Sequence, residues 1–201
     1  LTKVQIPNLA LLYGAMLAGA DFVLMGAGIP REIPAALDAL ALHRPAVLRF
    51  EVEGAAADAA SWLGLDPAHH WEGARPEIRR PRFVPIVSSN SLAAMLARKT
   101  AGGVDGFVVE GSTAGGHNAP PRGGMTPGAD GEPTYGLRDR VDLAKLRDLG
   151  LPFWVAGGMG WPHRLSEARA AGAAGVQVGT LFAYCNESGF APDLKHAVLA
   201  H

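Results

Sequence analysis

The loop that carries His117 has the residues expected of an active site. Residues 107–117 read Phe-Val-Val-Glu-Gly-Ser-Thr-Ala-Gly-Gly-His, an apolar run that gives way to a polar, glycine-rich stretch. Gly115 and Gly116 let the backbone bend sharply before the histidine. Ligands of parallel α/β folds bind at the carboxyl ends of strands, and imidazole titrates near neutral pH. We therefore predict that His117 handles a proton at an active site, the alternative being a solvated surface histidine.

Two later strand ends carry residues that suit a phosphate group. Gly157 and Gly158 follow the apolar run 153–156, and Gly179 and Thr180 follow the run 175–178. A helix is expected to begin after each pair, and the free N–H groups of a helix start, with a threonine hydroxyl beside them, suit a phosphate. Ordinary strand-to-helix turns also use glycine. The two pairs in succession favour phosphate, because barrels commonly bind it after their last two strands.

Other motifs are weaker. Gly26-Ala27-Gly28 follows a strand, but the third glycine of a dinucleotide fingerprint would fall at Arg31. We interpret this segment as a tight turn, whose backbone in a barrel could approach a flat ligand. Residues 111–115 do not form the G-x-S-x-G elbow of a serine hydrolase. No histidine or acidic spacing supports a metal site, and Cys185 is the only cysteine.

Composition excludes several classes of function. The chain has 201 residues, 48% of them hydrophobic, and a formal net charge of −1, which suits one globular domain over residues 1–201. Because 18 Lys+Arg stand against 19 Asp+Glu, there is no basic field for nucleic acid. No run approaches the ~20 apolar residues of a spanning helix, so we expect no membrane partner. The single cysteine fits a reducing cytoplasm, where we expect the protein.

Periodicity predicts strands and helices in alternation. Strands are expected over 22–26, 46–52, 83–87, 106–110, 152–156 and 175–179, and helices over 9–19, 31–42, 91–100, 141–149, 162–171 and from residue 180. Residues 54–81 are expected to form an insert, an alanine-rich helix followed by an irregular loop. Residues 111–140 are expected to form a long active-site loop.

Six strands alternating with helices predict an α/β fold with a parallel sheet, either open and doubly wound or closed into a barrel. Six is two short of the (β/α)8 TIM barrel, and the chain begins at Leu1 without a methionine. We therefore expect a fragment that holds about six of the eight βα units, with the first strands missing.

The chain resembles the nitronate monooxygenase family and the related flavin-type enoyl-acyl carrier protein reductases. The resemblance rests on Glu110–His117 together with Ala156-Gly-Gly158 and Val178-Gly-Thr180. It implies an FMN-binding (β/α)8 barrel, here strands three to eight, with His117 as the catalytic or substrate-facing residue. The residues that it implies for cofactor binding are Gly26, Glu110, Gly115, Gly116, Gly157, Gly158, Gly179 and Thr180.

The resemblance also implies a choice of activities. The first is oxidation of an alkyl nitronate with O2, and the second is reduction of an enoyl thioester by NAD(P)H. A third is a non-catalytic flavin-binding domain of a larger synthase. The family often has glutamine at the position of Glu110 and an acidic residue at that of Thr113, so the substrate stays open. A homodimer is also left open.

Overall fold

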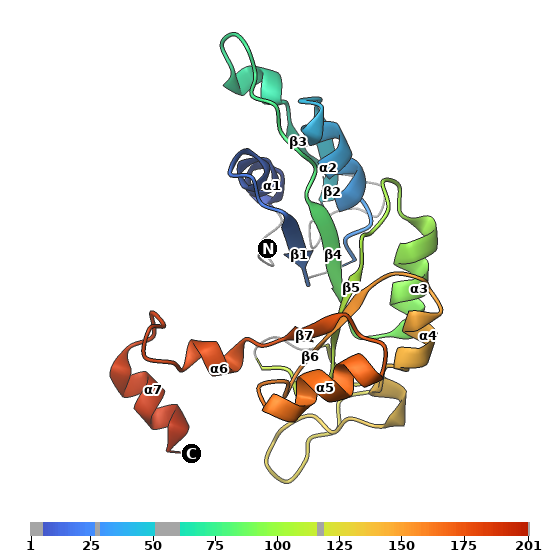
Figure 1. The fold of residues 1–201 in the computed structure, drawn as a ribbon, viewed down its shortest axis with the longest axis vertical. Coiled ribbons are helices and arrows are strands. Elements are labelled where there is room, and N and C mark those ends of the chain that lie inside the picture. The colour runs from blue at the N-terminus through green and yellow to red at the C-terminus, as the bar shows by residue number, and fades with distance from the viewer. Residues whose placement is uncertain (1–5, 27–28, 51–60, 116–118, 201) are drawn as a thin grey trace. The chain divides into compact units, whose positions relative to one another are not determined.

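The structure, a computed structural model, describes residues 6–26, 29–50, 61–115 and 119–200 (Figure 1). The chain divides into two compact units, Leu1–Phe107 and Val108–His201. Within these described residues, five strands follow the order β1-β4-β5-β6-β7, and two others, β2 and β3, form a separate sheet. The fold is therefore α/β with a parallel sheet, as the sequence predicts.

The elements fall close to the predicted ranges. The strands are β1 (Phe22–Met25), β2 (Ala46–Phe50), β3 (Ser61–Leu65), β4 (Arg82–Val87), β5 (Phe107–Glu110), β6 (Phe153–Ala156) and β7 (Gly175–Gln177). The α-helices are α1 (Asn8–Leu17), α2 (Ile33–Ala41), α3 (Asn90–Lys99), α4 (Leu143–Arg147), α5 (Pro162–Ala170), α6 (Thr180–Ala183) and α7 (Pro192–Leu199). Two 3-10 turns, Pro67–His70 and Leu137–Asp139, complete the described structure.

The first unit is built on a parallel strand pair. β1 pairs with β4, so that Phe22 lies opposite Arg82 and Met25 lies opposite Pro85. Both strands are short apolar runs, as strands of a parallel sheet are. The core of this unit consists of fully buried side chains from helices and strands, among them Leu12, Met16, Leu37, Leu40, Phe83, Val84, Val87 and Leu96.

The helix α3 begins directly after a serine cap, one residue before the predicted start at 91. The Ser89 hydroxyl accepts a hydrogen bond from the Leu92 N–H at 3.1 Å, which satisfies one of the free donors of the first turn. This cap lies directly after β4 and so fixes where strand gives way to helix. Arg98 and Lys99 in the last turn complement the helix dipole.

The β2–β3 hairpin differs from the prediction. The predicted strand at 46–52 is present as β2, but it pairs antiparallel with β3 and not with the parallel sheet. Its burial alternates, with Val47 and Arg49 exposed, which suits a sheet with one solvated face. The prediction of an irregular loop after the alanine-rich segment is wrong at residues 61–65, because these residues form β3. Residues 54–60 lie outside the described residues.

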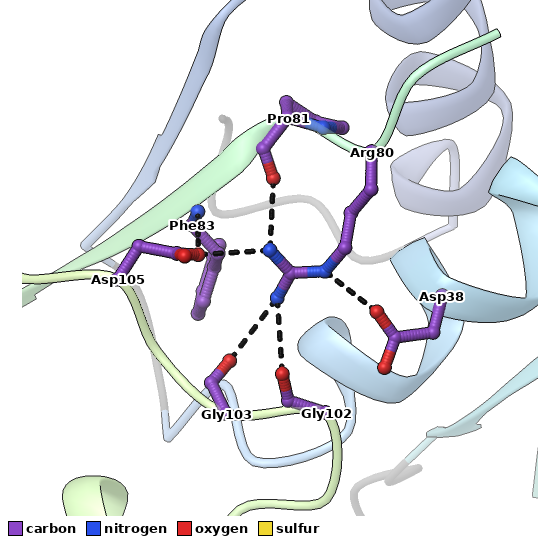
Figure 2. Close-up of polar contacts among 7 residues, drawn as sticks. All are labelled: Asp38, Arg80, Pro81, Phe83, Gly102, Gly103 and Asp105. Atoms are coloured by element: carbon purple, nitrogen blue, oxygen red, sulfur yellow. Dashed lines mark hydrogen bonds and ion pairs between the residues drawn. The ribbon is translucent and has the colours of Figure 1, made fainter.

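Arg80 holds the amino ends of β4 and β5 together (Figure 2). Its Nη1 donates to Asp105 Oδ2 at 2.8 Å and to Pro81 O at 3.1 Å, while Nε forms an ion pair with Asp38 of α2 at 2.6 Å. Its Nη2 donates to the carbonyls of Gly102 and Gly103, both at 3.2 Å. The side chain is 22% exposed, and all of these partners lie within the first unit.

The Asp105 carboxylate belongs to the same cluster. Its Oδ2 also accepts the Phe83 N–H of β4 at 2.8 Å (Figure 2). In barrels, residues at the amino ends of strands support stability, and the chemistry belongs to the carboxyl ends. We therefore assign the Arg80 cluster, defined as Arg80 with Asp38 and Asp105, to stability.

The second unit is organised by β6 and β7. They pair in parallel, with Trp154 opposite Gly175 and Ala156 opposite Gln177. Phe153 and Leu146 are fully buried and form the centre of this unit. The predicted final helix starts at Thr180 but ends at Ala183, and α7 follows as a separate helix.

Lys195 ties α7 to the segment that follows α6. It is 7% exposed and donates to the carbonyls of Cys185, Asn186 and Ser188 at 2.8, 3.2 and 3.0 Å. A buried ammonium group needs such partners, and here three carbonyls occupy its three donors. Within the described residues, no helix has the length and apolar character needed to cross a membrane.

Candidate functional site

The predicted glycine-rich loops of the second unit meet in one hollow of about 760 Å³. Six predicted residues line it: Glu110, Gly115, Gly157, Gly158, Gly179 and Thr180. These residues follow the carboxyl ends of β5, β6 and β7, the place where parallel sheets bind ligands. The volume lies within the range of small-molecule sites, about 300–1,000 Å³.

Gly157 allows the loop after β6 to lie against the loop after β5. Its φ of +94° is unfavourable for other residues, and a Cβ there would lie 2.8 Å from Ala114 N and 3.1 Å from Thr113 Oγ1. The Gly111 N–H also donates to Ala156 O at 3.4 Å. The absent side chain at 157 is therefore required by close approach of the two loops.

Gly115 lies against Thr180 in the same way. A Cβ at Gly115 would collide with the Thr180 hydroxyl oxygen. The loop after β5 thus reaches the start of α6 as well as the loop after β6. Gly115 and Thr180 therefore lie side by side, and both line the hollow.

The start of α6 supplies hydrogen-bond donors to the hollow. Gly179 is its N-cap residue, and no side chain caps the helix. The first N–H groups of any helix have no partner within that helix, so Thr180 and Leu181 present theirs. Both residues line the hollow. This end of the site therefore suits an anionic group.

Glu110 is the titratable group that the hollow contains at the end of β5. Its side chain is partly buried, and this burial raises the pKa of the carboxyl group above its ordinary value of 4.5. A carboxylate in such a place can accept a hydrogen bond or a proton. Glu110 also stands next to Gly111, from which the predicted active-site loop departs.

Three predicted residues are not placed in the hollow. His117 and Gly116 lie outside the described residues. Gly26 belongs to the first unit, at the end of β1, where a Cβ would lie 3.0 Å from the Ile86 side chain. That close approach to β4 is a packing reason for glycine at 26.

Sequence reasoning missed the apolar side of the hollow. Met159, Trp161, Leu181 and Phe182 line it, and Trp161 and Phe182 are 66% and 64% exposed. A signal for Trp161 was present in the sequence, because this residue lies only four positions after Gly157, in a predicted phosphate-binding turn. Leu199 of α7 also lines the hollow and has no comparable signal in the sequence.

The Asp139 carboxylate joins two parts of the predicted loop 111–140 through hydrogen bonds to backbone N–H groups. Its Oδ1 accepts the Arg122 N–H and its Oδ2 accepts the Gly136 N–H, both at 2.7 Å. These backbone hydrogen bonds lower the pKa of the Asp139 carboxyl group. Among the described residues, no three His, Cys, Asp or Glu side chains gather as ligands for a metal ion.

Parallel strands, the helices that follow them and the glycine-rich loops at their carboxyl ends place the chain among proteins of the TIM-barrel class. A family model described as nitronate monooxygenase matches residues 79–201. The chain belongs to the nitronate monooxygenase family, and the match covers all of the residues that line the hollow.

Individual relatives agree with this assignment. The probable nitronate monooxygenase of Bacillus subtilis (strain 168) is 38% identical over 97 residues, which are 48% of this chain and 26% of that protein. Among solved structures, a FabK mutant from Thermotoga maritima matches 98% of this chain and 48% of its own, with a TM-score of 0.61 and 22% identity. FabK from the same organism matches 95% of this chain and 43% of its own, with a TM-score of 0.57 and 22% identity. The two structural matches establish the fold.

Proposed function

We propose that the protein is an FMN-dependent oxidoreductase that oxidises alkyl nitronates with O2. The observation that carries the proposal is the meeting of the Glu110–Gly115 segment with Gly157–Gly158 and Gly179–Thr180 in one hollow, in a chain of the nitronate monooxygenase family. The chain spans 26% of the curated relative and 48% and 43% of the two solved structures, so the proposal concerns the whole protein.

The lining of the hollow fits FMN. A flat phosphate ester needs donors at one end and an apolar wall along its ring. Gly158, Gly179 and Thr180 supply the polar end, since no side chain stands between the phosphate and the N–H groups of α6. Met159, Trp161 and Phe182 supply the apolar wall. The chemistry that bound FMN supplies is the transfer of electrons from the substrate to an acceptor.

Two titratable residues complete the proposal. Glu110 would accept a hydrogen bond from the cofactor, because it ends β5 at the edge of the hollow. We assign His117, on the evidence of its sequence context, the role of a base or of a donor that stabilises charge beside the substrate. The loop that carries it leaves β5 directly after Glu110.

Anaerobic mixing tests the reaction. The full-length protein is mixed with an alkyl nitronate or with NAD(P)H, and the absorbance of the bound flavin is followed. Bleaching by the nitronate alone supports the proposal. Bleaching by NAD(P)H alone would instead indicate reduction of an enoyl thioester, and a protein that never retains flavin would refute both.

A pair of histidine variants tests the assigned role. His117→Ala should lower turnover of the nitronate at least tenfold and leave FMN content unchanged. His163→Ala, at an exposed position in the first turn of α5, serves as the control and should retain full turnover. Equal turnover in His117→Ala and the parent protein would exclude His117 from the chemistry.

A further inference from the structure

A second hollow lies in the first unit, and none of the residues assigned to the candidate site lines it. It has a volume of about 840 Å³ and is lined by α2, by the β2–β3 hairpin and by the end of α3. The hairpin packs on α2, as Figure 1 shows. Ala35, Ala36 and Ala39 give this part of α2 a surface of small side chains. The hollow thus has an apolar floor.

The charged side chains that line this hollow are mostly cationic. Among the described residues, they are Arg31, Arg49 and Lys99, against the single carboxylate of Glu32. Glu32 Oε2 already accepts the Arg49 N–H at 2.8 Å. Among the described residues, no carboxylate forms an ion pair with any of the three cations. Because the whole chain has a net charge of −1, this cationic excess is local.

The hairpin places an aromatic ring beside these charges. Arg49 lies directly opposite Trp62 in the register of β2 and β3, and Val47 lies opposite Gly64. Trp62 and Val47 are 57% and 56% exposed, and a Cβ at Gly64 would meet no atom within 4 Å. The indole therefore offers an open, flat surface for stacking next to a guanidinium group.

We propose that this hollow binds a nucleoside phosphate, with the base on Trp62 and the phosphates among Arg31, Arg49 and Lys99. Guanidinium groups bind phosphate oxygens in pairs, and an indole stacks on a base. The volume suits a small molecule, about 300–1,000 Å³, and the balanced charge of the chain disfavours a nucleic-acid polymer. The proposal does not depend on the proposed oxidoreductase activity.

Tryptophan fluorescence of the full chain, titrated with ADP, tests the proposal. The chain has four tryptophans, so Trp62→Phe identifies the part of the signal that comes from residue 62. We expect saturable quenching that Trp62→Phe removes and that Trp161→Phe, in the other hollow, retains. Adenosine and pyrophosphate should each bind at least tenfold more weakly than ADP, because each lacks half of the recognised chemistry.

Charge-neutralising variants test the phosphate contacts. Arg49→Gln and Arg31→Gln should each raise the Kd for ADP about tenfold, the effect of losing a charge-assisted hydrogen bond. Arg98→Gln, an exposed neighbour of Lys99 outside the hollow, should change it less than twofold. All of these side chains are exposed, and an unchanged melting curve verifies folding.

Three results would overturn the proposal. The first is the absence of saturable quenching by ADP at millimolar concentration. The second is ADP binding that Arg49→Gln and Arg98→Gln weaken equally. The third is ADP binding that Trp161→Phe abolishes and Trp62→Phe does not, since this would place the ligand in the hollow of the second unit.

Discussion

Gly115 lies so close to Thr180 that any side chain at 115 would collide with the threonine hydroxyl. This relationship joins the loop after β5 to the first residue of α6. Position 115 therefore requires glycine because there is no space for a side chain. This steric requirement can be tested separately from any requirement for backbone flexibility.

A double-mutant cycle tests this relationship. Gly115→Ala should destabilise the protein by about 1–3 kcal/mol, the usual cost of overpacking. Thr180→Ala removes the colliding oxygen, so the double variant should recover most of that loss. Thr180→Val keeps an atom in the same place and should not rescue. Urea unfolding compares the parent protein, the three single variants and the two double variants, and equal losses in both double variants would contradict the stated cause.

The adjacent glycines 157 and 158 should differ in their tolerance of alanine. Gly157→Ala combines a φ of +94° with a contact of 2.8 Å to a backbone nitrogen, so we expect a loss of about 3 kcal/mol or more. Gly158 has a φ of +65° and its nearest neighbour, Thr113 Oγ1, is 3.5 Å from the added Cβ, so we expect about 1–2 kcal/mol. Thermal unfolding of Gly157→Ala and Gly158→Ala measures the two losses of stability, and equal losses would argue against the close approach at residue 157.

The Arg80 cluster should contribute more to the free energy of unfolding than the neighbouring ion pair of Arg79. Arg80→Met removes the guanidinium donor from two carboxylates and three carbonyls, and we expect a loss of about 2–4 kcal/mol. Arg79→Met is the control, because Arg79 pairs with Asp21 where the two side chains are 79% and 69% exposed. Exposed pairs contribute about 0–1 kcal/mol. Similar losses in the two variants, measured by denaturant unfolding, would refute the assignment.

Glu110 should make stability depend on pH. Its pKa is raised by burial in the folded protein, so the folded state binds more protons than the unfolded state. Its contribution is therefore most favourable below 4.5 and is lost as the pH rises through the folded-state value. Glu110→Gln should become more stable relative to the parent protein as the pH rises from 4 to 7. Exposed Glu132, changed to Gln, is the control, and parallel pH profiles for both variants would refute this prediction.

Lys195 should hold α7 in place. Lys195→Met removes the ammonium donor from three carbonyls, and the amide hydrogens of residues 192–199 should exchange at least tenfold faster. Lys145→Met is the control, since Lys145 is 71% exposed and lies 3.7 Å from Asp142. Unchanged exchange in α7 would show that apolar packing alone retains the helix.

The sequence predicts the parallel strands and the glycine-rich loops because both leave local signals. An apolar run that stops at glycine marks a strand end, as at Val109 and Ala156, and Ser89 marks a cap. The meeting of Gly157, Gly115 and Thr180 follows from the order of these strand ends. Their roles in catalysis and in cofactor binding stay predictions.

The hairpin and the Arg80 cluster were not predictable in this way. The strand Ser61–Leu65 follows an alanine-rich stretch that favours a helix, and its pairing with β2 is decided by packing on α1 and α2. Arg80 lies among arginines that resemble a solvated loop. Only the fold brings Asp38 and Asp105 to it, because no short-range pattern encodes contacts between distant segments.

β5 is only four residues long, and it separates a residue bound to Arg80 from a residue that lines the candidate site. Asp105, just before it, contacts the arginine that fastens the strand ends, and Glu110 opens the loop at its other end. A strand of this length spans roughly 13 Å, so neither end touches the other. Loop residues beyond Glu110 can therefore be replaced without removing any partner of Arg80, because all of those partners precede β5 in the chain.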